Sequence, residues 1–80
     1  MNATYSKQAV KAINAMESSE KKRIRAAIDK LPEGDVKPLQ GAKGHFRLRV
    51  GGHRIIFSYP APGIVLVEKI GPRGDVYKGG

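Results

Sequence analysis

The hydrophobic residues of this chain change their spacing once, near residue 44, and this change constrains the fold more than any other feature. Between residues 9 and 31, apolar side chains recur at intervals of three and four residues, as on one face of a helix. From residue 45 to residue 50, apolar and polar side chains alternate strictly, as in a strand with one buried face. A chain with helices followed by such strands is expected to fold as α+β, with its helices packed on an antiparallel sheet.

Two helices, forming a helical hairpin, are expected in the first half of the chain, after a short N-terminal strand at residues 3–5. Ser6 is a suitable N-cap for the first helix, whose apolar face consists of Ala9, Val10, Ile13 and Met16. Ser18 or Ser19 is expected to cap the second helix, whose apolar residues are Ile24, Ala27, Ile28 and Leu31. Pro32 and Gly34 are expected to end it.

Three strands, joined as an antiparallel β-meander, are expected after the helices. Residues 32–44 are rich in Pro, Gly and short polar residues, which predicts a loop. Strands are expected at 45–50, 54–59 and 64–70, with a two-residue turn at Gly51-Gly52 and another turn at 60–63. The continuous apolar run at 55–57 indicates burial on both faces of the sheet. We therefore expect helices on one face and arginines on part of the other.

The length of the chain, 80 residues, predicts a single domain at residues 1–80. The chain contains no cysteine, which excludes disulfides and thiolate zinc sites and suits a reducing compartment. No apolar run approaches the roughly 18 residues of a membrane span, and the first residues lack the apolar stretch of a signal peptide. We therefore expect a cytoplasmic protein with no membrane partner.

The charge is strongly positive, with 15 Lys and Arg against 7 Asp and Glu, a net charge of +8. Residues 41–80 carry 7 basic and 2 acidic side chains, and no acidic residue lies between Val36 and Val67. Such a surplus favours a polyanionic partner through the release of counterions. The alternative is a solvated basic face that only maintains solubility.

The sequence offers little for metal or cofactor chemistry. Its only histidines are His45 and His53, and the first acidic residue after them is Glu68. Ser58 lies in an apolar strand without the flanking glycines of a nucleophile elbow, and the glycines match no phosphate-binding loop. We expect no metal and no cofactor.

Arginines form the candidate site instead. Arg47 and Arg49 lie two positions apart on one predicted strand, so their side chains share a face roughly 6.8 Å apart, which is comparable to the spacing of neighbouring phosphates. Arginine binds phosphate oxygens in pairs and stabilises negative charge that develops at phosphorus. We expect RNA to bind at Arg47, Arg49, His45 and Lys43; Arg54, Arg73 and Tyr77 complete the cluster.

Four segments carry a resemblance to a known family: LQG at 39–41, FRLRVG at 46–51, HRIIF at 53–57 and IGPRGDVYK at 70–78. Over nearly its whole length the chain resembles the RelE/ParE superfamily of bacterial toxins, the toxins of type II toxin-antitoxin systems. The resemblance implies the same order of elements that the periodicity predicts. This order is that of the RelE-like microbial RNase-type fold. It also implies a cognate antitoxin as partner.

RelE-type members of this superfamily are endoribonucleases that cut messenger RNA in the ribosomal A site without a metal and so inhibit translation. The 2′-OH attacks the adjacent phosphate and leaves a 2′,3′-cyclic phosphate. By this resemblance, Arg54 and Arg73 match the phosphate-stabilising and leaving-group arginines, and Tyr77 matches the C-terminal active-site tyrosine. Arg47 and Arg49 occupy positions where RelE-type enzymes can carry lysines that help to activate the 2′-OH.

The general base and the target stay open at this point. Arginine stays protonated and is a poor base, whereas a histidine titrates near neutral pH. His45 is expected to share the face of Arg47 and Arg49, and His53 to point to the opposite face, although a strand histidine is more often a surface or packing residue. The alternatives to a nuclease are a ParE-like inhibitor that acts by binding DNA gyrase, and a catalytically weak RNA-binding relative.

Overall fold

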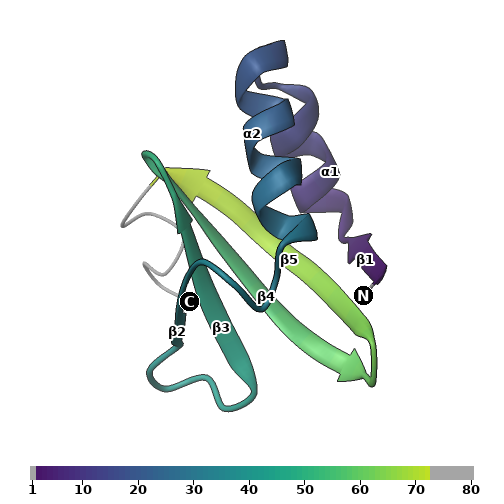
Figure 1. The fold of residues 1–80 in the computed structure, drawn as a ribbon, viewed down its shortest axis with the longest axis vertical. Coiled ribbons are helices and arrows are strands. Elements are labelled where there is room, and N and C mark those ends of the chain that lie inside the picture. Colours follow the sequence, from purple (N-terminus) through teal and green to yellow (C-terminus); the bar gives the residue numbers. More distant parts are fainter. Residues whose placement is uncertain (1, 73–80) are drawn as a thin grey trace.

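The structure is a computed structural model that describes residues 2–72, and Figure 1 shows its arrangement of two helices beside one sheet. The elements in chain order are β1 (Asn2–Tyr5), α1 (Lys7–Asn14), α2 (Ser18–Asp29), β2 (Asp35–Pro38), β3 (His45–Val50), β4 (His53–Ala61) and β5 (Ile64–Pro72). The expected α+β class is confirmed, with a short first strand, a helical hairpin and an antiparallel meander.

The five strands form one sheet in the order β1-β5-β4-β3-β2. The strands β2 to β5 pair with their neighbours in antiparallel fashion, whereas β1 pairs with β5 in parallel. Both helices pack on the same face of the sheet, where the core lies between them and the strands. Its fully buried members are Ala9, Ile24, Leu48, Ile55, Phe57, Val65 and Val67. The other face, which we call the open face, carries the alternate residues of β3 and β4.

Ser6 joins the start of α1 to β5. Its hydroxyl accepts a hydrogen bond from the Ala9 amide at 3.1 Å, as predicted for an N-cap, and donates one to the Glu68 carbonyl at 2.6 Å. Two residues later, the Gln8 side-chain amide contacts both backbone polar groups of Ile70, accepting at 3.2 Å and donating at 3.4 Å. These bonds fix the first helix on the strand that separates β1 from β4.

Two predictions about the first half of the chain are wrong. The N-cap of α2 is Glu17 and not a serine, and it makes no capping hydrogen bond through its side chain. The expected loop at 32–44 contains a strand, β2, which is four residues long and ends at a proline. An edge strand this short has no clear alternation, and it forms because its backbone pairs with β3 and Val36 packs against the core.

Tyr5, at the end of β1, is partly buried and packs against the core. Burial raises the pKa of its phenol, and the nearby Arg25 guanidinium opposes this shift. Neither helix among residues 2–72 is long and apolar enough to cross a lipid bilayer.

Replacing Ser6 with Ala is predicted to lower the free energy of unfolding by about 1–2 kcal/mol, because the first amides of α1 lose their cap and the link to Glu68 is broken. Urea denaturation followed by circular dichroism measures this change. The matched control is Ser19→Ala, at an exposed position in the first turn of α2. Equal losses in the two variants would show that the Ser6 hydroxyl does not hold α1 in place.

Candidate nucleic-acid interface

The open face carries its polar side chains in rows that run across the strands. Residues directly opposite each other on paired strands point to the same face. The first row contains Asp35, Arg49, Arg54 and Gly71, and the second contains Lys37, Arg47, Ile56 and Lys69. His45 and Ser58 are paired in a third row. The predicted placement of His45, Arg47 and Arg49 on one face is therefore confirmed, and Arg54 lies on the same face.

Arg49 and Arg54 are directly opposite each other on β3 and β4. The Arg49 side chain is exposed and that of Arg54 is half-buried. Two guanidinium groups on opposed positions of neighbouring strands form a site of concentrated positive charge, which suits a phosphate as ligand.

Arg47 is the one charged side chain within residues 2–72 that is buried. Only 10% of its side chain is exposed, and its nearest acidic group is the Asp35 carboxylate, with Nη1 and Oδ2 4.0 Å apart. No group in the described part of the chain forms a hydrogen bond with this Nη1 atom. A buried guanidinium with an unsatisfied donor is costly, so its position favours an anion as the missing partner.

His45 is held between two acceptors. Its Nδ1 lies 3.2 Å from the Lys43 carbonyl and its Nε2 lies 3.0 Å from Glu68 Oε1. The Ser58 hydroxyl donates to the other carboxylate oxygen, Oε2, at 3.0 Å. Both ring nitrogens therefore face acceptors of the protein, and neither is directed at a substrate hydroxyl.

His53 points to the other face of the sheet, as predicted. It pairs with Val50, and its Nε2 lies 3.8 Å from a carboxylate oxygen of Glu20 on α2. It therefore belongs to the contact between the hairpin and the helices. Neither histidine of the chain is thus placed to act as the base.

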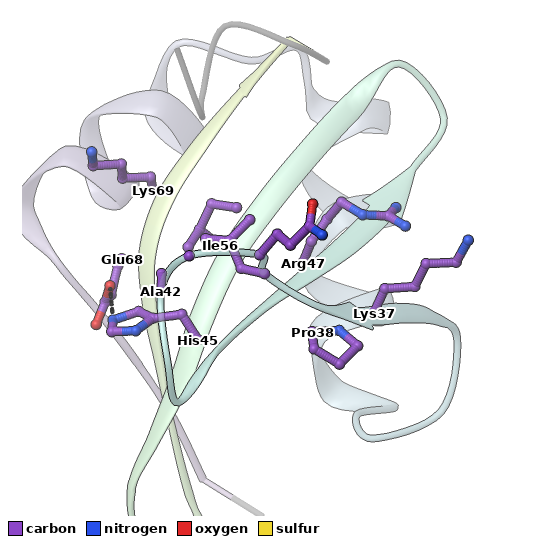
Figure 2. Close-up of a pocket in the computed structure, with 11 residues that line it drawn as sticks. Lys37, Pro38, Ala42, His45, Arg47, Ile56, Glu68 and Lys69 are labelled. Atoms are coloured by element: carbon purple, nitrogen blue, oxygen red, sulfur yellow. Dashed lines mark ion pairs between the residues drawn. The ribbon is translucent and has the colours of Figure 1, made fainter. Parts of the chain in front are cut away.

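A pocket of about 550 Å³ opens beside Arg47, and Figure 2 shows its lining. The connection at 39–44 forms one wall, and Ile56 and Arg47 lie on the sheet side. Positive φ angles at Gly41 and Gly44, 79° and 82°, allow the connection to make its sharp turns. The Leu39 amide donates to the His45 carbonyl at 2.9 Å and closes the base of the loop. The lining mixes apolar and cationic side chains.

Three charged residues of the lining were not identified from the sequence: Lys37, Glu68 and Lys69. Lys37 was not identified because β2, the strand that contains it, was predicted as a loop. Glu68 and Lys69 are neighbours in β5 and would face opposite sides under strict alternation, but the register shifts between Ile56 and Phe57. This irregularity brings both side chains to the pocket. Lys43 is exposed in the connection, and its carbonyl is what contacts His45.

Two of the residues assigned to the chemistry, Arg73 and Tyr77, lie outside the described residues. Among residues 2–72, no cluster of three His, Asp or Glu side chains is placed to hold a metal ion. The interface described by the structure therefore consists of the three rows and the pocket beside them.

Comparisons with known proteins were made with both sequence and structure. No family model and no curated protein matches the sequence. Solved structures do match: 92% of the chain superposes on 94% of a chain from the RelB-RelE antitoxin-toxin complex of Methanococcus jannaschii, with a TM-score of 0.74 and 21% identity. A chain from the archaeal RelE-RelB complex of Pyrococcus horikoshii OT3 matches over 92% of this chain and 96% of its own length, with a TM-score of 0.73 and 25% identity.

The chain has a RelE-like fold. The RelE-like fold implied by the sequence motifs is thereby confirmed. In this fold, the open face with its rows of arginines is the surface that the helices leave uncovered.

Replacing Arg47 with Met is predicted to leave the free energy of unfolding unchanged or to raise it by about 1–3 kcal/mol. The substitution removes a buried charge whose donor is unsatisfied and keeps most of the apolar volume. Urea denaturation measures the change, and Leu48→Ala at the adjacent core position, expected to lose about 2–5 kcal/mol, calibrates it. A loss above about 2 kcal/mol in Arg47→Met would show that this arginine is there for stability.

Proposed function

We propose that this chain is the toxin of a type II toxin-antitoxin system and that it cleaves messenger RNA in the ribosomal A site without a metal. The observation that carries the proposal is the RelE-like fold combined with arginines on three positions of its open face. An array of guanidinium groups on an uncovered sheet is suited to a polyanion. The net charge of +8 supports the same class of partner.

In the proposed reaction, the 2′-OH of one nucleotide attacks the phosphorus that follows it. The bond between phosphorus and O2′ forms, the bond to O5′ breaks, and a 2′,3′-cyclic phosphate and a 5′-OH are left. Arg54, opposite Arg49, stabilises the charge that builds up on the phosphate oxygens. By the resemblance, Arg73 acts at the leaving group and Tyr77 is the C-terminal active-site tyrosine. The 2′-OH loses one proton and the O5′ leaving group gains one, so the step is balanced without a metal.

A cognate antitoxin is the proposed protein partner in the cytoplasm. Both structural neighbours are described as RelE in complex with RelB. The basic surface suits an acidic segment that folds on binding, and Val10 and Tyr59, 44% and 37% exposed, provide apolar contact area.

Expression of the chain alone is predicted to arrest growth and to produce new mRNA 5′ ends within translated codons, mapped by primer extension. Arg54→Gln should reduce cleavage at least about 100-fold, because one charge-stabilising group is lost from the transition state. Arg25→Gln, which removes the same charge from the exposed side of α2, should cleave as the parent chain does. Arg54→Lys serves as a second variant, and thermal unfolding checks that each variant folds.

Intact mRNA together with a DNA-damage response would contradict the nuclease and support a gyrase inhibitor. Growth arrest that is unchanged in Arg54→Gln and in Arg73→Ala, with mRNA intact, would support a relative that only binds RNA.

The complex with the antitoxin is predicted to survive gel filtration at about 0.5 M salt, because burial of apolar surface contributes to binding beside the screened charges. The same run at low salt is the reference. If the two proteins always separate at the higher salt concentration, the apolar part of the interface does not exist.

A further inference from the structure

We propose that Glu68 is a positioning residue of the open face. Its carboxylate holds the 39–44 connection beside the arginine rows, and the His45 imidazole is the bridge between them. The inference rests on the proposed function for its effect on cleavage, because it names a residue that arranges the same face without contacting the RNA.

Glu68 lies at a bulge of β5. Ile56 on β4 pairs with Lys69, and the next residue, Phe57, pairs with Val67. In the described part of the chain, Glu68 therefore stands opposite no residue of β4, and the pairing of β5 with β1 already ends at Val67. A bulge leaves its extra residue out of the ladder. The position of Glu68 thus depends on contacts other than strand pairing.

Three contacts fix Glu68 at this bulge. Its backbone carbonyl accepts a hydrogen bond from the Ser6 hydroxyl at 2.6 Å. One carboxylate oxygen lies 3.0 Å from Nε2 of His45, as Figure 2 shows, and the other accepts from the Ser58 hydroxyl at 3.0 Å. The backbone of Glu68 is therefore tied to the start of α1, and its side chain is tied to β3 and β4.

The backbone of the 39–44 connection bonds only to itself and to the residue that follows. The Leu39 amide donates to the His45 carbonyl at 2.9 Å, and the His45 amide donates to the Ala42 carbonyl at 3.0 Å. Within the described part of the chain, the backbone hydrogen bonds of this connection stay within residues 39–45. They shape the connection but do not attach it to β5.

His45 supplies the attachment. Its Nδ1 lies 3.2 Å from the Lys43 carbonyl in the connection, and its Nε2 lies against Glu68 on β5. A polar network whose members are satisfied makes a local arrangement rigid. Glu68 therefore restrains the connection through the imidazole.

The charge of Glu68 separates positioning from binding. Among the described residues that line the pocket, Glu68 is the one acidic residue, and Lys37, Arg47 and Lys69 line it as well. A carboxylate among these cations weakens the attraction of the face for a polyanion. Removing it is therefore expected to improve binding of RNA while it disturbs the arrangement of the connection.

The connection lies close enough to the arginines for its position to affect the reaction. It forms one wall of the pocket of about 550 Å³ that Arg47 also lines. A misplacement of about 1 Å away from the reacting atoms can cost about 100-fold in rate. Loss of the Glu68 carboxylate is thus expected to lower the rate of cleavage and not the affinity.

The first test is amide hydrogen exchange of the full chain, followed by NMR. Glu68→Ala is expected to speed exchange at the Leu39 and His45 amides at least about tenfold, because the connection opens more often. Glu68→Gln keeps an acceptor for His45 and should change these rates less than about threefold. The matched control is Glu20→Ala, which removes a carboxylate 3.8 Å from His53 on the other side of the sheet and should change neither rate.

The second test is single-turnover cleavage of mRNA on ribosomes. Glu68→Ala should lower the rate at saturating toxin at least about tenfold and leave the half-saturating concentration unchanged or lower. Glu68→Gln should stay within about threefold of the parent chain, and Glu20→Ala should match it. Thermal unfolding checks that each variant folds.

Unchanged exchange at Leu39 and His45 in Glu68→Ala would overturn the proposal, whatever the cleavage rate. Equal losses of cleavage in Glu68→Ala and Glu68→Gln, or a loss confined to the half-saturating concentration, would also overturn it. If Glu68→Ala does not fold, His45→Phe removes the bridge from its other end and is judged by the same criteria. A parent chain that does not cleave mRNA refutes the proposed function, whereas the exchange measurement still decides whether Glu68 holds the connection.

Discussion

The register between β3 and β4 is the constraint on which the rest of the structure depends. It pairs Arg49 with Arg54 and Arg47 with Ile56, and it places Leu48 opposite Ile55 on the core face. A slip of one residue would move the apolar residues of a strand to the open face and its arginines into the core. The core face therefore fixes the register, and the register in turn fixes which arginines are neighbours. Burial of Leu48, Ile55 and Phe57 thus positions the charged site on the opposite side.

The open face is built at a cost to stability. The Arg47 guanidinium is buried, and its Nη1 donor is unsatisfied among residues 2–72. This feature opposes folding, and an anionic acceptor would relieve it. On the other face, Ser6 and Gln8 form hydrogen bonds that hold the first helix on β5. The packed helices keep the sheet, and therefore the positions of the arginines, rigid. Stability and binding are thus separated between the two faces of one sheet.

Much of the fold follows from local patterns. The helical period at residues 9–31 and the alternation at 45–50 depend only on how Cβ atoms are placed along a helix and a strand, so these elements were predicted. Most of their buried residues were predicted as well, but Val10, assigned to the apolar face of the first helix, is 44% exposed. The same rule placed His45 with the arginines and His53 on the opposite face. The alternation rule did not predict β2. This edge strand has only four residues, too few to show a clear alternation, and it forms through its pairing with β3.

The sequence by itself thus determined the class of fold, the shared face of His45, Arg47 and Arg49, and the basic character of that face. Only the tertiary structure decided that Arg47 is buried and that Lys37 and Lys69 flank it. It also decided that the Glu68 carboxylate contacts both His45 and Ser58. The physical reason is that alternation is a property of each strand alone. The pocket instead depends on a shift in strand register and on a connection that folds back over the sheet, and both arise from contacts between residues distant in the chain.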